Sequence, residues 1–102
     1  MPASGPLVLH RRAGFWAFMA ECRVARGRLA AARRCYSRAA ELERRTFETL
    51  PLERPRSRGI IGRSTYWLLV KAGLAQEAAA WKARMAADPS IPAFALREME
   101  DR

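Results

Sequence analysis

Apolar residues recur along most of this chain three and four positions apart, the spacing that places them on one face of an α-helix. Glycine or proline interrupts the spacing at Gly27, Pro51, Gly73 and Pro89. The interrupted pattern predicts four or five helices, at about residues 12–26, 28–49, 60–71, 74–87 and 91–101. An all-α protein is therefore expected.

Each predicted helix has one face that is expected to be buried. In the first helix this face carries Phe15, Met19, Cys22 and Arg26, with Trp16 and Ala20 beside it. In the second helix it carries Leu29, Ala32, Tyr36, Ala39, Leu42 and Thr46 or Phe47. The third and fourth helices contribute Ile61, Thr65, Leu68 and Ala72, and then Leu74, Ala78, Trp81 and Met85. The last helix is expected to bury Ala95, Leu96 and Met99.

The segments between the helices also follow from residue type. Gly27 and Gly73 are expected to end their helices, because glycine readily takes the left-handed conformation of a helix end. Ser90 is the expected N-cap of the last helix. The predicted organisation is one domain, 1–102, made of a flexible leader (1–11), a helix pair (12–49), a linker rich in proline and arginine (50–59), a second pair (60–87) and a final helix (91–101).

Residues 13–46 resemble one tetratricopeptide repeat, a helix pair whose pattern describes packing between two antiparallel helices. The resemblance rests on large, small and aromatic residues at the repeat's spacing, namely Trp16, Ala20, Gly27, Ala32, Tyr36 and Ala39. Arg23 departs from the pattern, because that position is usually aromatic, and the proline expected at the end of the repeat is absent.

The second half resembles the same family more loosely. Gly73 and Ala78 reproduce the five-residue offset between Gly27 and Ala32, and the linker adds 12 residues to the 34-residue period. The resemblance implies antiparallel helical hairpins stacked as a short tetratricopeptide-like α-α superhelix, with two repeats and a C-terminal capping helix. Since about three repeats are usually needed for independent stability, an apolar edge is expected to meet another molecule, in a homodimer or as a subunit of a larger complex.

Members of this family are partner-binding scaffolds, so the resemblance implies a non-catalytic adaptor whose groove is lined by the first helix of each pair. Carried onto this chain, the groove contains Glu21, Val24, Arg63, Trp67 and Lys71. The last three are four residues apart and form one stripe that suits an acidic protein or peptide partner. Alternatively, Trp67 belongs to the core and the flanking charges are solvated.

The net charge of +9 is confined to the first part of the chain. Residues 1–63 hold 14 arginines against five acids, whereas residues 64–102 hold five basic and five acidic groups. This excess is expected either to attract anions such as nucleic acid, or to reflect a genome that favours arginine and alanine codons. The anion-binding candidates are Arg33, Arg34, Arg38, Arg56 and Arg58. Nucleic-acid binding is the second choice, because Phe15, Trp16 and Tyr36 are expected in the core rather than between the arginines.

Enzyme chemistry finds little support. His10 is the only histidine and has no carboxylate neighbour in sequence, and Gly59-x-x-Gly62 lacks the length and the lysine of a phosphate-binding loop. Cys22 and Cys35 have no metal-ligand spacing, so they are expected to be buried free thiols, with no metal and no cofactor. Because neither a signal peptide nor a membrane-spanning run is present, a cytoplasmic protein with no membrane partner is expected.

Overall fold

The computed structural model describes residues 5–100 and confirms the all-helical prediction, since those residues contain no strand. About 79% of them are helical. The five helices are α1 (Pro6–Ala25), α2 (Leu29–Thr49), α3 (Pro55–Lys71), α4 (Ala75–Ala87) and α5 (Ala93–Arg97).

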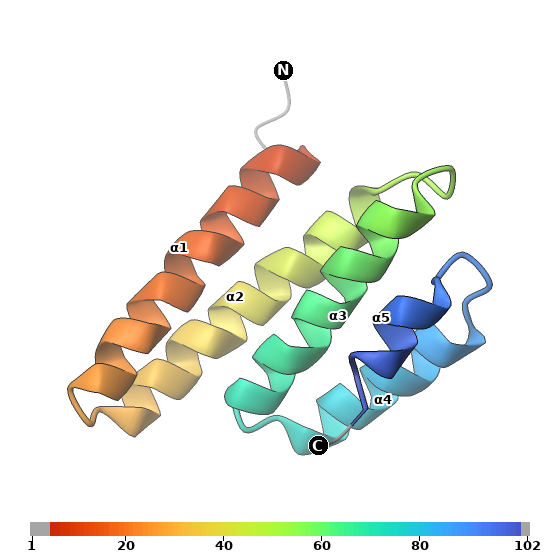
Figure 1. Ribbon diagram of the computed structural model, residues 1–102. Coiled ribbons are helices and arrows are strands. Elements are labelled where there is room, and N and C mark those ends of the chain that lie inside the picture. Colours follow the sequence, from red (N-terminus) through yellow and green to blue (C-terminus); the bar gives the residue numbers. More distant parts are fainter. Residues whose placement is uncertain (1–4, 101–102) are drawn as a thin grey trace.

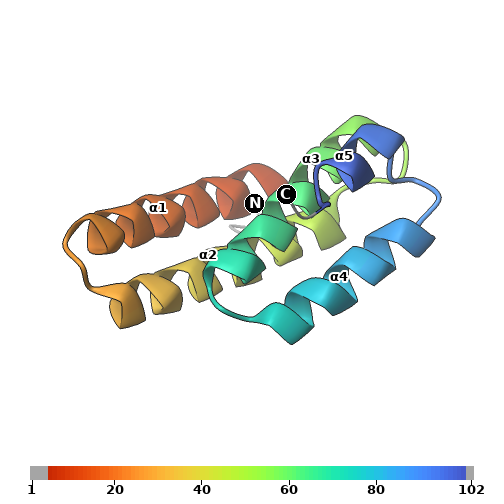
Figure 2. The same cartoon turned by 60° about the horizontal axis from the view of Figure 1, so that its bottom comes forward.

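The helices form a flat, two-layered array with extents of 40 × 39 × 18 Å. Successive helices run in opposite directions, and each packs against the next along the chain (Figure 1). Turned by 60°, α1, α3 and α5 lie on one side of the array and α2 and α4 on the other (Figure 2). The short α5 packs against both α3 and α4, whereas α1 packs mainly against α2.

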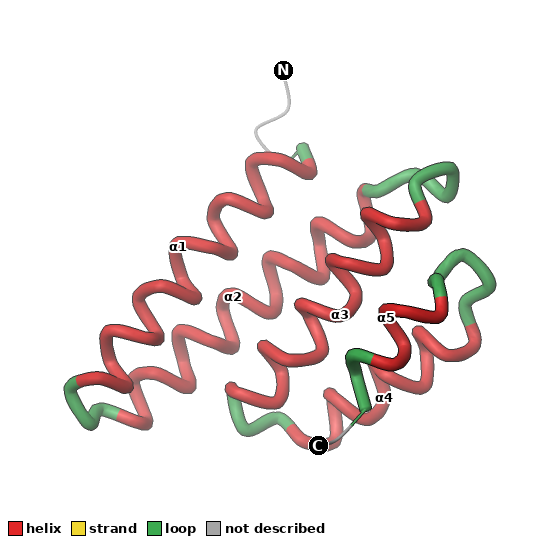
Figure 3. Tube along the Cα trace, viewed as in Figure 1, coloured by secondary structure: helices red, strands yellow, loops and turns green. Residues whose placement is uncertain are grey.

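Two identical turns close α1 and α3, as the sequence predicted. Gly27 and Gly73 have φ angles of 71° and 79°. At Gly27 its own N–H and that of the next residue donate to carbonyls three and five residues earlier, both at 2.9 Å, and at Gly73 the same bonds measure 3.0 Å. This is the Schellman motif, which satisfies the last carbonyls of a helix. The connections between the helices appear as short loops in Figure 3.

Two helices begin earlier than the sequence predicted. α1 starts at Pro6 rather than near Arg12, because Leu9 is 2% exposed and packs with Ala13 against α2. The predicted leader is therefore helical from residue 6, and residues 1–4 lie outside the described part. α3 starts at Pro55 instead of Ile60, since proline is tolerated in the first turn of a helix, and this shortens the linker to residues 50–54.

The final helix differs from the prediction in length and in its cap. α5 covers five residues, and Pro92 rather than Ser90 occupies its N-cap position. Ser90 instead turns back to Asp88: its backbone N–H and its hydroxyl donate to Asp88 Oδ1 at 2.9 and 2.7 Å. The predicted N-cap was wrong because α5 begins at Ala93, three residues after Ser90. Residue 101 of the predicted helix lies outside the described part.

Most of the predicted inward positions are buried, and one continuous core joins all five helices, with Ala20 as its buried member from α1. Three expectations fail. Leu29 is 58% exposed in the first turn of α2, and Phe15 is 55% exposed on α1. Arg26, directly after the last residue of α1, is exposed as well. The buried face of α1 is instead formed by Leu9, Ala13 and Ala20.

The Gly59-x-x-Gly62 motif lies inside α3 and serves close packing. A Cβ atom on Gly59 would come within 2.9 Å of the Pro92 ring, and one on Gly62 within 2.8 Å of Met85 Sδ. Trp81 Nε1 also donates to the Gly62 carbonyl at 2.8 Å. The missing side chains therefore let α4 and the start of α5 approach α3.

Candidate interaction surface

The α1 outer face, defined as Leu7, Val8, Arg11, Gly14, Phe15 and Phe18, is the most apolar exposed surface of this fold. Of the eight large apolar side chains exposed in residues 5–100, five belong to α1. Leu7 is 61% exposed, Phe15 55% and Phe18 65%. Arg11 lies four residues after Leu7 and four before Phe15, and Phe18 follows three residues later, so these positions share one side of the helix. Contiguous exposed apolar surface of this kind marks an interaction site.

Sequence reasoning assigned these residues elsewhere. Phe15 was expected in the core, and Leu7 and Val8 in the flexible leader. The signal that indicates their exposure is the breadth of the apolar pattern: α1 is apolar around most of its circumference. A helix that is packed mainly against one neighbour cannot bury all of its sides.

The arginines of α1, α2 and the turn between them are almost all without an acidic partner. Ten arginines lie in this part of the chain, and within the described residues only Arg44 is paired, with Glu41 at 2.8 Å. All four acids of α1 and α2 are occupied. Glu21 contacts Lys71 of α3, and Glu48 contacts Arg84 of α4. Two of the four carboxylates are therefore paired with cations from outside α1 and α2.

A buried carboxylate ties the first three helices together. Glu43 of α2 is 3% exposed and accepts hydrogen bonds from His10 Nδ1 at 3.0 Å and from Ser64 Oγ at 3.0 Å. His10 therefore has a carboxylate partner that its sequence neighbours did not reveal. The order is not that of a catalytic triad, because the carboxylate, rather than the histidine, lies between the other two groups.

Two of the predicted groove residues, Glu21 of α1 and Lys71 of α3, lie near each other, and Glu21 is engaged within the fold. Glu21 accepts a hydrogen bond from the Tyr36 hydroxyl and lies 3.8 Å from Lys71 Nζ. Burial, together with the hydrogen bond to and the negative charge of Glu21, raises the pKa of Tyr36 to about 12. This contact links α1 to both α2 and α3 on that side of the array.

Arg63 and Trp67 face the end of α5 rather than an open groove. Arg63 pairs with the carboxylate of Glu98, and Trp67 Nε1 donates to the Glu98 backbone carbonyl at 2.7 Å. Val24 is 43% exposed near the end of α1. Two residues of the predicted stripe, Arg63 and Trp67, thus contact Glu98 of the same chain.

Arg58, one of the predicted anion-binding residues, is used inside the fold. Its guanidinium is 9% exposed, lies 4.2 Å above the Phe47 ring and donates to Ser90 Oγ, the Leu50 carbonyl and Asp88 Oδ2 at 2.9, 2.9 and 3.1 Å. Hydrogen bonds from Ser90, and also the Arg58 charge, lower the pKa of Asp88. Arg58 therefore holds the end of α2 and the turn before α5 onto α3. Arg56, two residues earlier, is exposed.

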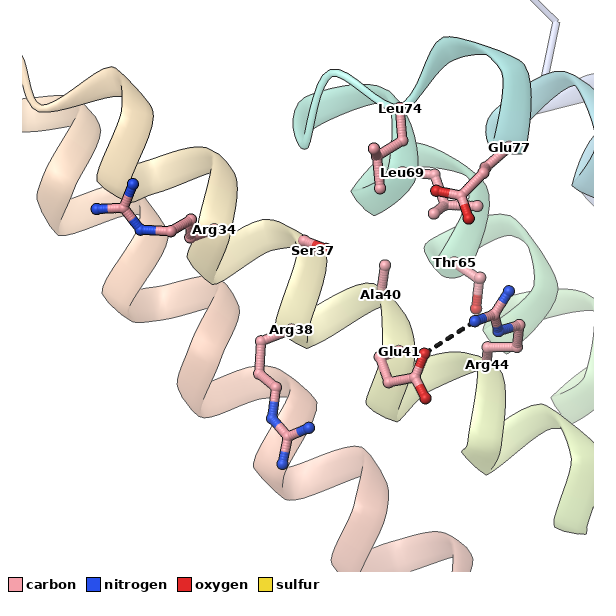
Figure 4. Close-up of a pocket in the computed structure, with 10 residues that line it drawn as sticks. All are labelled: Arg34, Ser37, Arg38, Ala40, Glu41, Arg44, Thr65, Leu69, Leu74 and Glu77. Carbon is pink, nitrogen blue, oxygen red and sulfur yellow. Dashed lines mark hydrogen bonds and ion pairs between the residues drawn. The ribbon is translucent and has the colours of Figure 1, made fainter.

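A pocket of about 380 Å³ opens between α2, α3 and the start of α4. Figure 4 shows that the guanidinium groups of Arg34 and Arg38 point away from Thr65 and Leu69, whereas Arg44 reaches toward them. Arg33 lies elsewhere, with its side chain against Gly73. The predicted basic residues of α2 therefore do not converge on one anion site.

Further observations bear on chemistry and on relatives. No three metal-ligating side chains of residues 5–100 lie together, and Cys22 and Cys35 are free thiols. Within the same residues, none of the helices has the length and apolar content needed to cross a membrane. The chain matches no protein-family model, and comparison with curated proteins and with solved structures gives no significant match.

Proposed function

We propose that this chain is a non-catalytic, tetratricopeptide-like scaffold that binds a protein partner through the α1 outer face. The observation that carries the proposal is the exposure of Phe15 and Phe18 on a helix that packs mainly on one neighbour. Large aromatic side chains provide much of the binding energy where proteins meet. The expected location remains the cytoplasm, where free thiols are usual.

The tetratricopeptide-like arrangement is part of the proposal. It is supported by two helix pairs that repeat the same glycine-closed turn, by the alternation of helices between two layers, and by α5 in the position of a cap. In such an array each edge is a surface on which another helix packs. The α1 edge is the one that α5 does not cover.

Nucleic-acid binding is a second candidate, favoured by one observation. The aromatic side chain of Phe15 was expected in the core, but it is exposed, and Arg11 lies four residues before it on the same helix. Exposed aromatic rings interleaved with arginines bind single strands through base stacking and charge. The protein-partner proposal ranks first because the arginines of α2 do not converge.

Affinity capture tests the proposal with matched surface variants. Tagged wild-type chain, the double variant Phe15→Ser/Phe18→Ser and the control Leu52→Ser are exposed to an extract of the producing cells supplemented with the untagged chain. Leu52 is 66% exposed in the loop between α2 and α3, away from α1. We expect a protein, the untagged chain included, that wild type and the control retain and the double variant loses.

The same samples distinguish the two candidates. Capture through a protein contact should persist after nuclease treatment. Material that disappears with nuclease, and whose binding falls by orders of magnitude between low and moderate salt, would favour nucleic acid instead. If nothing captured depends on Phe15 and Phe18, the α1 outer face is not the binding surface.

A further inference from the structure

Gly14 lies between Arg11 and Phe18 along the α1 outer face and has no packing role within the chain. A glycine inside a helix is unfavourable compared with alanine, so its presence calls for a neighbour that needs the space. In α3, Gly59 and Gly62 each have such a neighbour, because an added Cβ would contact Pro92 or Met85. At Gly14 an added Cβ would meet nothing within 4 Å. The space over Gly14 is available to another molecule.

We propose that a second copy of this chain occupies the α1 outer face, with the two α1 helices antiparallel about a twofold axis. This rests on the proposed function and names the partner. In the proposed register, the number of a residue in one copy and the number of the residue that faces it in the second copy add up to 29. Gly14 then faces Phe15 of the second copy, Arg11 faces Phe18 and Leu7 faces Cys22.

The residues of this face are self-complementary in that register. A twofold contact makes every pairing occur twice, so one sequence must supply both sides. The missing side chain of Gly14 makes room for the ring of Phe15 from the other copy, and the guanidinium of Arg11 meets the ring of Phe18 as a cation above an aromatic face. A shift of four residues in one direction would leave Phe15 opposite His10, which is turned toward Glu43. A shift of four residues in the other direction would leave Gly14 opposite Met19, which packs against the core of its own chain.

Charge gives this contact a distinctive salt dependence. Each copy carries a net charge of +9, and Arg11 belongs to the face itself, so two copies repel one another at low ionic strength. Added salt screens this repulsion and leaves the apolar contact intact. Self-association should therefore strengthen as salt rises, whereas binding to an acidic protein, a nucleic acid or an anionic membrane should weaken.

The contact is expected to be weak, because one pair of helices covers less than the roughly 800 Å² per partner of a standard stable interface. Sedimentation velocity on the full chain from about 5 to about 500 µM spans the range of weak affinities. We expect a monomer–dimer equilibrium whose dimer fraction is larger at about 0.5 M than at about 0.05 M salt.

Variants on and off the face identify the surface. Phe18→Ala should weaken the dimer at least tenfold, and Leu52→Ala, at an equally exposed site, should leave it unchanged. Gly14→Leu is more informative, since it adds apolar surface. Non-specific apolar association would increase in Gly14→Leu, whereas a close antiparallel contact over Gly14 would be lost. Persistence of the dimer in Gly14→Leu and Phe18→Ala would overturn the proposal.

Disulfide trapping tests the register. In Leu7→Cys the new thiol would face the native Cys22 of the second copy, while positions 7 and 22 of one chain are about 22 Å apart along the helix and cannot be bridged. Oxidation should give a covalent dimer of Leu7→Cys at a rate well above that of Leu52→Cys. Replacing Cys22 by serine in the Leu7→Cys variant should abolish the covalent dimer, and a dimer that forms without Cys22 would contradict the register.

The outcomes separate this inference from the proposed function. A chain that stays monomeric at about 500 µM in both salts overturns the dimer, even if Phe15 and Phe18 still capture another protein. In that case the scaffold function stands with a different partner. A dimer that weakens with salt also overturns the inference, since the contact would then depend on attraction between opposite charges.

Discussion

The two ends of the helical array use similar residues for opposite purposes. At the C-terminal end, Gly59 and Gly62 admit neighbouring elements, and Met85 and Met99 are completely buried. At the N-terminal end, Gly14 has open space above it and Phe18 is 65% exposed. Close packing over a glycine is therefore achieved within the chain at Gly59 and Gly62, whereas no atom of the same chain fills the space over Gly14.

The polar contacts differ between the ends in the same sense. At the C-terminal end, which α5 covers and which is called the capped end, Arg58 joins three segments through its three nitrogens. At the N-terminal end, called the open end, Arg11 has no acidic partner within the described residues. On the proposed function, the capped end serves stability and the open end serves contact, so mutations at the two ends should separate folding from association.

The largest expected difference comes from removing a large apolar side chain at each end. Met85→Ala should lower the free energy of unfolding by about 2–5 kcal/mol, because Met85 is fully buried and a cavity would remain. Phe18→Ala should change it by less than about 0.5 kcal/mol. Urea unfolding at low protein concentration measures both, and equal losses would refute the contrast.

A smaller difference is expected for the arginines of α3. Arg58→Met removes hydrogen bonds to Asp88, Ser90 and the Leu50 carbonyl, and should cost about 2 kcal/mol of unfolding free energy. Arg56→Met is the matched control, two residues away and exposed, and should lie within about 0.5 kcal/mol of wild type. If both variants unfold like wild type, Arg58 does not hold the capped end together.

The sequence revealed more of the capped end than of the open end. Gly27 and Gly73 identified the helix ends because a left-handed residue is a local requirement, and Trp81 and Met85 followed from their helical spacing. The exposure of Phe15 could not be predicted in this way. Periodicity reports which residues share a face, but it does not report whether a neighbouring helix covers that face.

The same limit applies to the polar contacts. His10 and Ser64 meet at Glu43 across 33 and 21 residues of sequence, and only the packing of three helices brings them together. Arg58 was predicted to bind anions from its position in an arginine-rich segment. Its actual role depends on Asp88, which is 30 residues away in the sequence.

Substituting one glycine at each end should change stability in opposite directions. Gly14→Ala should raise the free energy of unfolding by about 0.5–1 kcal/mol, because the new methyl group meets no atom and alanine favours the helix. Gly59→Ala should lower it by about 1 kcal/mol, since the Pro92 ring and Ala95 leave no room. Thermal unfolding of dilute protein measures both changes. A stabilised Gly59→Ala would show that α5 can shift to make room for the added methyl group.

The smallest expected effect is a dependence on pH at the capped end only. The pKa of Asp88 is lowered in the folded chain, first by the Ser90 hydroxyl, so the ionised carboxylate favours folding. This contribution is fully present above the ordinary value of about 3.8 and disappears as the pH falls through the lowered pKa. Wild type should therefore be more stable than Asp88→Asn at neutral pH, and the difference in unfolding free energy should close below pH 3.8.

Phe18→Ala should show no such convergence with wild type, because no titrating group is removed at the open end. A gap between wild type and Asp88→Asn that stays constant down to about pH 2 would mean that the Asp88 charge does not help to hold the cap.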